Sequence, residues 1–219
     1  MHFGDQLIAR VRALGHPLCV GLDPHLDRIA PLFRRGTMAP GDPATAEAVE
    51  DFVNAIIDRL EGRVAVVKPQ IAFFEQLGWR GLQVLERVVD RCRRRGLLVL
   101  LDAKRGDIGS TAKGYARSYL TEDAPLRVDA ITLNAYLGLD TLEPFAATGA
   151  GLFVLVRTSN PGAGDLQDLE TEDGPMRLQA NWSENSLSDD PVLIRALVQG
   201  SLDALFEATD EYIAAEIAD

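Results

Sequence analysis

Short, continuous apolar runs alternate along this chain with longer segments in which apolar residues recur every three or four positions. The runs predict strands buried on both faces of a parallel sheet, and the longer segments predict amphipathic helices. Strands are expected at residues 17–24, 64–70, 97–101, 130–134 and 151–157. Helices are expected at residues 1–15, 45–61, 73–95, 111–120 and 139–147, with a long loop at 31–43. Gly78 and Gly81 predict a break near the start of the third helix.

This alternation is typical of a (β/α) barrel or of a doubly wound sheet, both of which are α/β folds. Each expected strand runs directly into polar residues at its carboxyl end, where both folds bind their ligands. The alternation stops after residue 157. Residues 170–190 are polar and predict a loop, whereas residues 191–218 predict one C-terminal helix that begins at Pro191. The length of 219 residues fits a single domain spanning 1–219.

Composition narrows the classes of function that fit the chain. The net charge of −11 at pH 7 argues against a nucleic-acid surface, because no basic stripe offsets it. The one dense basic cluster, Arg91 with 93–95, ends an expected helix and is interpreted as complementing the helix dipole. No apolar run reaches membrane-spanning length, and Cys19 and Cys92 are expected as free thiols of a reducing compartment. We therefore expect a cytoplasmic protein that binds neither nucleic acid nor membrane.

The most informative stretch runs from Leu97 to Thr111, where a buried strand ends in closely spaced charges. Asp102 and Lys104 are two positions apart, so their side chains leave the same face if the strand continues that far. Asp107 follows in the next loop. An ammonium held between carboxylates stays protonated and keeps them ionised, because each charge favours the charged form of the other. The alternative is a solvated loop of mixed charge, although charges that end a buried strand usually mark the ligand face of an α/β fold.

Five segments at successive strand ends match one known family in order. They are Gly-Leu-Asp-Pro at 21–24, Lys-Pro-Gln-Ile-Ala-Phe-Phe-Glu at 68–75, Asp-Ala-Lys-Arg-Gly-Asp-Ile at 102–108, Thr-Leu-Asn at 132–134 and Arg-Thr-Ser-Asn-Pro-Gly at 157–162. Together they resemble the bacterial subgroup of the orotidine 5'-monophosphate decarboxylase family, over about residues 1–175. The resemblance implies a (β/α)8 TIM barrel, a homodimer and no cofactor or metal. It also implies conversion of orotidine 5'-monophosphate to uridine 5'-monophosphate in pyrimidine synthesis.

The resemblance further implies a catalytic set. Lys68, Asp102, Lys104 and Asp107 resemble the charged tetrad of the family. Lys104 would protonate C6 of the pyrimidine, and Asp102 would lie against the departing carboxylate. Loss of CO2 leaves an electron pair in the ring plane that no π-system absorbs, so a fixed ammonium is suited to stabilise and then protonate it.

The implied substrate-binding residues lie at the same strand ends. Asp23 and Lys68 resemble the ribose-hydroxyl ligands, and Ser159 resembles the residue that recognises the pyrimidine edge. Asp107 and Thr111 would cross into the active site of the partner subunit. The full expected binding set is Asp23, Ile108, Thr111, Ser159 and Asn160.

Two features depart from the family pattern. Ala135 stands where the family usually has a proline, which is expected to change only loop stiffness. The glycine-rich segment and the arginine with which the family's last strands hold the substrate phosphate are not found. A barrel that is incomplete after the fifth or sixth strand is therefore expected, and residues 160–164 are the remaining candidate for the phosphate.

Alternatives fit parts of the pattern. Lys68 could be a structural ion-pair partner. Asp23 and Ser159 could each belong to an ordinary turn. Among enzymes, Mg²⁺-dependent phosphosugar decarboxylases and aldolases share Asp-x-Lys-x-x-Asp but carry an acid where this chain has Lys68. An alternative from a different functional class is that the chain is a catalytically impaired or non-catalytic descendant of the decarboxylase family. It would then act only as a dimeric structural or interaction protein.

Overall fold

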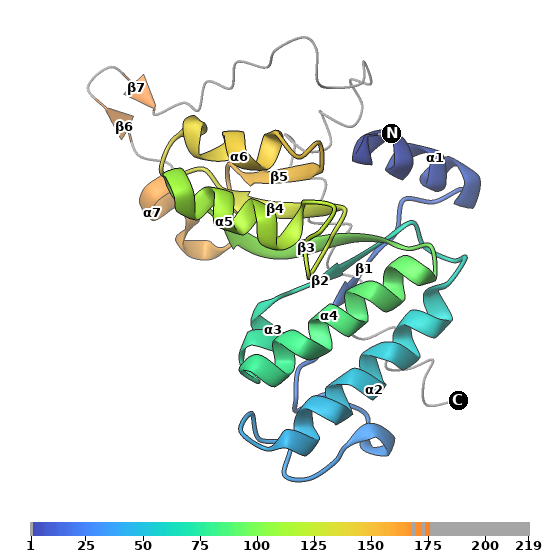
Figure 1. Cartoon of the computed structure of the whole chain (residues 1–219). Coiled ribbons are helices and arrows are strands. Elements are labelled where there is room, and N and C mark those ends of the chain that lie inside the picture. The colour runs from blue at the N-terminus through green and yellow to red at the C-terminus, as the bar shows by residue number, and fades with distance from the viewer. Residues whose placement is uncertain (1, 168–169, 172–173, 176–219) are drawn as a thin grey trace.

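Five parallel strands form one sheet in the computed structural model, which describes residues 2–167, 170–171 and 174–175 (Figure 1). The strands are β1 (Cys19–Leu22), β2 (Val66–Pro69), β3 (Leu98–Arg105), β4 (Ala130–Asn134) and β5 (Gly151–Leu155). All five predicted strands are therefore confirmed. β3 continues beyond its apolar run to Arg105, so Asp102 and Lys104 belong to the strand itself.

Helices connect the five strands of the sheet, precede β1 and follow β5. They are α1 (Phe3–Leu14), α2 (Pro43–Leu60), α3 (Ala72–Glu75), α4 (Trp79–Arg94), α5 (Gly109–Tyr119), α6 (Glu143–Ala146) and α7 (Gly164–Gln167), with 3-10 turns η1 (Pro31–Phe33), η2 (Leu139–Leu142) and η3 (Pro161–Ala163). The predicted break between α3 and α4 occurs at Gly78, whose φ of 64° favours glycine. Two helices begin two residues earlier than predicted. α5 begins at Gly109, and α2 begins at Pro43 because Asp42 caps it by accepting a hydrogen bond from Ala44 N.

The strand order decides between the two folds that the sequence allowed. The order is β1-β2-β3-β4-β5, without the reversal that defines a doubly wound sheet. Right-handed connections between neighbouring strands then place the connecting helices on one face, as in a barrel. One apolar cluster joins that face to the helices and includes Leu22, Val67, Val99, Leu101, Ile131, Leu133, Val53, Leu85 and Phe145. The other face forms a second cluster with α1, made of Phe3, Cys19, Val66, Leu98, Leu100 and Ala130.

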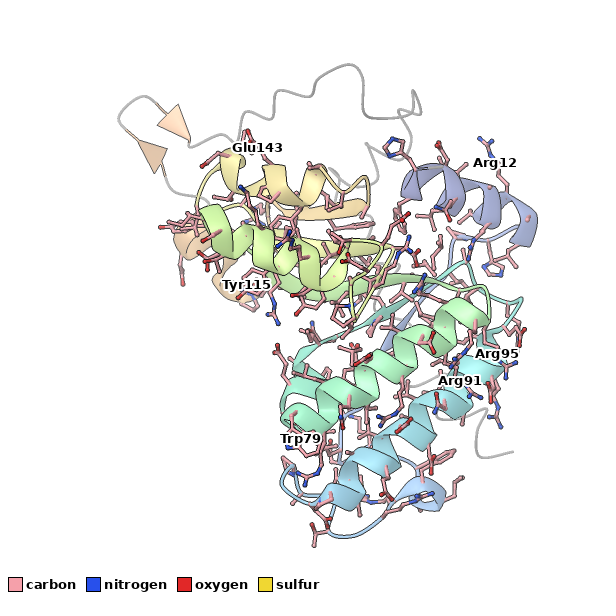
Figure 2. The ribbon with its side chains drawn as sticks, in the orientation of Figure 1. Arg12, Trp79, Arg91, Arg95, Tyr115 and Glu143 are labelled. Atoms are coloured by element: carbon pink, nitrogen blue, oxygen red, sulfur yellow. The ribbon has the colours of Figure 1, made fainter. Side chains whose placement is uncertain are left out.

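α2 and α4 lie side by side (Figure 1), and ion pairs between charged side chains connect them. Figure 2 shows Arg91 and Arg95 at the end of α4 beside α2. Arg91 Nη2 lies 2.7 Å from Asp58 Oδ2, and Arg95 Nη2 lies 2.9 Å from Asp58 Oδ1. Arg94 pairs with Asp90 of its own helix at 2.6 Å. The basic cluster therefore does more than complement a helix dipole, because it ties α4 to α2.

Residues after β5 are described only in part. Glu170–Thr171 (β6) and Gly174–Pro175 (β7) pair as a two-stranded antiparallel sheet at the start of the predicted 170–190 loop. The rest of that loop and the predicted 191–218 helix lie outside the described residues. No helix in the described ranges is long and apolar enough to cross a membrane.

Candidate active site

The carboxylate of Asp102 is the centre of a polar cluster at the carboxyl ends of β2, β3 and β4. Its Oδ1 accepts hydrogen bonds from Lys104 Nζ at 2.5 Å and from Thr132 Oγ1 at 2.9 Å. Its Oδ2 accepts from Gln70 Nε2 at 2.9 Å and lies 3.3 Å from Lys68 Nζ. Only 10% of the Asp102 side chain is exposed, so the charge is buried but fully surrounded by donors.

The order of the parallel strands explains why these residues meet. β3 lies between β2 and β4, and the carboxyl ends of parallel strands share one edge. Gln70 forms a parallel bridge with Asp102, whose carbonyl oxygen accepts from Ile71 N at 3.2 Å. Lys68 and Gln70 are two positions apart and therefore present their side chains on the same face. The three strand ends thus converge on one carboxylate.

Both lysines keep Asp102 ionised. Burial by itself raises the pKa of the Asp102 carboxyl. The hydrogen bond from Lys104, the positive charges of Lys68 and Lys104 and the hydrogen bond from Thr132 oppose that effect and hold the pKa below its ordinary value. Asp102 is therefore a stable anion near neutral pH.

Lys104 has an uncommon backbone conformation. Its φ is 46°, in the left-handed region that residues other than glycine rarely adopt. The residue lies where β3 departs from regular pairing, because Leu101 pairs with Ile131 but Arg105 already pairs with Leu133. Such an irregularity is a β-bulge, which re-aims side chains and is common beside active sites. The Lys104 side chain is 46% exposed, so part of it is open to a ligand.

Arg105 anchors the loop that follows β3. Its guanidinium pairs with Glu75 of α3 and lies over the ring of Tyr115 of α5, 5.6 Å from the ring centre. These contacts tie the end of β3 to both neighbouring helices. The loop that carries Asp107 and Ile108 therefore begins at a residue whose side chain contacts two helices.

The structure brings together three of the four residues predicted as a catalytic tetrad. Asp107 is half-buried in the β3–α5 loop, and its Oδ1 accepts from Ile108 N at 2.7 Å. Within the described residues it forms no ion pair with Lys68 or Lys104. Ile108 and Thr111 are exposed, the first in the loop and the second in the first turn of α5.

The remaining predicted residues lie at the two edges of the sheet. Asp23 follows β1 directly and is half-buried, at the strand end where Leu22 pairs with Pro69. Ser159 and Asn160 are exposed in the loop after β5. Asn160 Oδ1 accepts a hydrogen bond from the Thr158 hydroxyl at 2.6 Å. All three follow strands at the carboxyl edge, but none joins the hydrogen bonds around Asp102.

Sequence reasoning assigned no role to Gln70 or Thr132, although both donate hydrogen bonds to Asp102. A signal for each was present in the spacing. Gln70 follows Lys68 by two positions, and Thr132 precedes Asn134 by two, so each shares a face with a strand-end polar residue. The spacing alone does not say which neighbouring strand they reach.

The cluster is unsuited to a divalent cation. An ammonium lies at each oxygen of Asp102, and these positive charges would repel a metal ion. In the described part of the chain, no group of three or more His, Cys, Asp or Glu residues has the geometry of a metal site. The ammonium groups therefore disfavour the Mg²⁺-dependent enzymes that share Asp-x-Lys-x-x-Asp.

A hollow of about 530 Å³ opens elsewhere, between η1 and α2 on the helical face. It is lined by Leu32, Phe33, Arg35, Asp51, Asn54, Ala55, Asp58 and Arg91. Its charged side chains pair with one another, Arg35 with Asp51 and Arg91 with Asp58. None of the predicted site residues lines it.

Known proteins resemble this chain in both sequence and structure. A family model described as "Orotidine 5'-phosphate decarboxylase / HUMPS family" matches residues 16–187. Relatives named orotidine 5'-phosphate decarboxylase include one from Rhodopirellula baltica, 45% identical over 180 residues, and one from Streptomyces coelicolor, 46% identical over 176 residues. Each match covers 78% of this chain and 60% of the relative. The structure of Leishmania donovani OMP decarboxylase is 37% identical with a TM-score of 0.63, and the match covers 80% of this chain and 61% of that one. The chain thus spans about 60% of the length of the curated relatives it matches.

Proposed function

Because the chain belongs to the orotidine 5'-phosphate decarboxylase / HUMPS family, we propose that it converts orotidine 5'-monophosphate to uridine 5'-monophosphate in pyrimidine biosynthesis. The enzyme would be a carboxy-lyase that needs no cofactor. Its sheet is the matching part of a (β/α)8 TIM barrel. The observation that carries the proposal is the ion pair between buried Asp102 and accessible Lys104, with Lys68 on the other carboxylate oxygen.

The proposed reaction uses Lys104 as the proton donor. The bond between C6 and the substrate carboxylate breaks, CO2 leaves and the electron pair stays on C6. The Lys104 ammonium stabilises this charge electrostatically and then transfers a proton from Nζ to C6, after which water reprotonates the amine. Asp102 would lie against the carboxylate and favour its departure. Its contact with Lys104 at 2.5 Å supports this assignment, because it places the carboxylate directly beside the proposed proton donor.

The proposed binding residues surround this pair. Lys68 and Asp23 would bind the ribose hydroxyls from the neighbouring ends of β2 and β1, whose paired register supports the assignment. Ser159 would recognise the pyrimidine edge from the loop after β5, assisted by Asn160. Ile108 is 61% exposed beside the catalytic strand, which suits an apolar contact with the substrate or with a second subunit.

The proposed homodimer is supported by an apolar patch that a second copy would cover. Tyr136, Leu137 and Leu139 are 84%, 51% and 50% exposed in the segment after β4. With Ile108 they form a patch on adjacent loops, since Arg105 pairs with Leu133 and α5 contacts η2. Asp107 belongs to the same pair of loops, so a partner there would bring it toward the other active site.

Other parts of the proposal rest on the sequence. Residues 1–219 are proposed as one domain, with 170–190 as a loop and 191–218 as a helix. Cys19 and Cys92 are free and buried, which suits the proposed cytoplasmic location.

The deciding experiment measures CO2 release from orotidine 5'-monophosphate by the purified chain. Lys104→Ala is expected to lower turnover by at least about 1,000-fold, because both the charge and the proton donor are lost. Lys113→Ala is the matched control, since Lys113 is exposed on α5. No turnover by the folded wild-type chain would contradict the proposal and favour the non-catalytic alternative.

A further inference from the structure

The hydroxyl of Thr132 makes three hydrogen bonds at the centre of the site. It accepts from the backbone N–H groups of Ala103 at 2.9 Å and Lys104 at 2.8 Å, and it donates to Asp102 Oδ1 at 2.9 Å. A hydroxyl has one proton and two lone pairs. Because both amides are donors, they occupy the lone pairs, and the proton of Thr132 is directed to the carboxylate.

The Thr132 hydroxyl accepts hydrogen bonds from two backbone amides of β3 that have no carbonyl partner on β4. Between the pairs Leu101–Ile131 and Arg105–Leu133, three residues of β3 face one residue of β4, which is Thr132. The β4 backbone therefore cannot match each N–H of the bulge with a carbonyl. Ala103 is buried, so an unpaired amide at that residue would be costly. The Thr132 side chain satisfies two of these amides, one of which belongs to Lys104 with its left-handed backbone.

We propose that Thr132 is a positioning residue whose hydroxyl sets both the Asp102 carboxylate and the backbone of Lys104 for the reaction. The catalytic part of this proposal rests on the proposed decarboxylation. Thr132 itself acts through its neighbours: its proton orients the anion, and its lone pairs hold the strand segment from which the Lys104 ammonium extends. The same hydroxyl therefore couples the two ends of the ion pair.

Groups from each neighbouring strand face Asp102, and they determine what loss of the hydroxyl does. β2 contributes the Lys68 ammonium and the neutral Gln70 amide, β3 contributes the Lys104 ammonium, and β4 contributes Thr132. Loss of the hydroxyl removes one donor to the anion, which raises the pKa of Asp102 relative to the wild-type chain. It also frees the amide of Lys104, so the position of the ammonium becomes less defined.

Three variants separate positioning from folding. Thr132→Val keeps the shape but removes the hydroxyl, whereas Thr132→Ser keeps the hydroxyl. Thr45→Val is the matched control, because Thr45 is buried in α2 and its hydroxyl donates to the Ala39 carbonyl at 2.8 Å. The titration of Asp102 is followed by carboxyl ¹³C NMR and assigned with Asp102→Asn, and kcat is measured from CO2 release.

We expect Thr132→Val to lower kcat by about 10- to 100-fold, the size of effect that a small misplacement of reacting groups produces. The Asp102 titration should move to higher pH in the same variant. Thr132→Ser should restore most of both values, and Thr45→Val should change neither. An unchanged titration and kcat in Thr132→Val would overturn the proposal.

Two further outcomes remain decisive. If no chain decarboxylates but Thr132→Val moves the Asp102 titration, the proposed function fails and the positioning of Asp102 stands. If Thr132→Val does not fold, hydrogen exchange of the backbone amides of Ala103 and Lys104 in the wild-type chain tests the proposal instead. Slow exchange supports their bonds to Thr132, and rapid exchange overturns them.

Discussion

Asp102 and Lys104 form an ion pair that runs from the interior of the protein to its surface. Their charged atoms lie 2.5 Å apart, yet the Asp102 side chain is 10% exposed and the Lys104 side chain is 46% exposed. The carboxylate accepts hydrogen bonds from Gln70 at the end of β2 and from Thr132 of β4, whereas part of the Lys104 side chain is open to solvent. The pair therefore joins a buried anion to a residue that a ligand can approach.

Asp102→Asn tests how this anion contributes to stability. The pKa of Asp102 is lowered in the folded protein, so its contribution is present above the pKa of the unfolded chain and is lost as pH falls through the lower folded value. At pH 7 the variant should lose about 2–4 kcal/mol of unfolding free energy, because two ammonium groups lose a buried charge partner. The loss should shrink below about pH 4, where the carboxylate of the unfolded wild-type chain binds a proton while that of the folded chain is still ionised.

Urea unfolding at pH 7 and pH 3 measures this difference. Asp27→Asn serves as the control, since Asp27 is exposed and should change stability by less than about 0.5 kcal/mol. An equal loss at both pH values would show that the charge of Asp102 is not the cause.

Gly106→Ala tests a close approach between the β3–α5 loop and β4. A Cβ at position 106 would lie 2.3 Å from the carbonyl oxygen of Asn134. The backbone would have to move, and we expect a loss of about 1–3 kcal/mol by thermal or urea unfolding. Gly114→Ala is the paired control, because no atom lies within 4 Å of its Cβ position in α5. That variant should gain up to about 1 kcal/mol from helix propensity, so equal losses at both positions would refute the explanation.

Leu137→Glu tests the proposed dimer contact. A charge placed in the patch of Ile108, Tyr136, Leu137 and Leu139 would be desolvated on association, so the variant should sediment as a monomer where the wild type sediments as a dimer. Leu32→Glu changes a leucine in η1 that is more exposed, at 70%, and should remain dimeric. A dimer that survives Leu137→Glu but not Leu32→Glu would place the interface elsewhere.

Both cysteines should resist thiol reagents in the folded protein. Burial raises the pKa of Cys19 and of Cys92 to about 12, which leaves almost no reactive thiolate at pH 8. We expect no labelling of the native chain by a chromogenic disulfide reagent at this pH and labelling of both thiols after unfolding in urea. Rapid labelling of the native protein would show that one of these segments opens readily.

The strands and the residues that end them could be predicted from the sequence. A continuous apolar run such as Leu97–Leu101 predicts a buried strand, and similar apolar runs predict the other four strands of the sheet. The family resemblance placed Lys68 and Asp102 in one charged tetrad, and the two residues form an ion pair where parallel strands end at one edge. The matched segments from 21 to 162 then identified the family.

Tertiary structure alone decided how the site is held. The bulge opposite Thr132, the left-handed backbone of Lys104 and the bonds of Gln70 and Thr132 to Asp102 depend on how strands some 30 positions apart come into register. Local propensity favours none of them, and a non-glycine residue with positive φ opposes it. Register is set by packing across the whole sheet, so the sequence determined which groups reach the edge of the sheet, and the fold determined which of them touch.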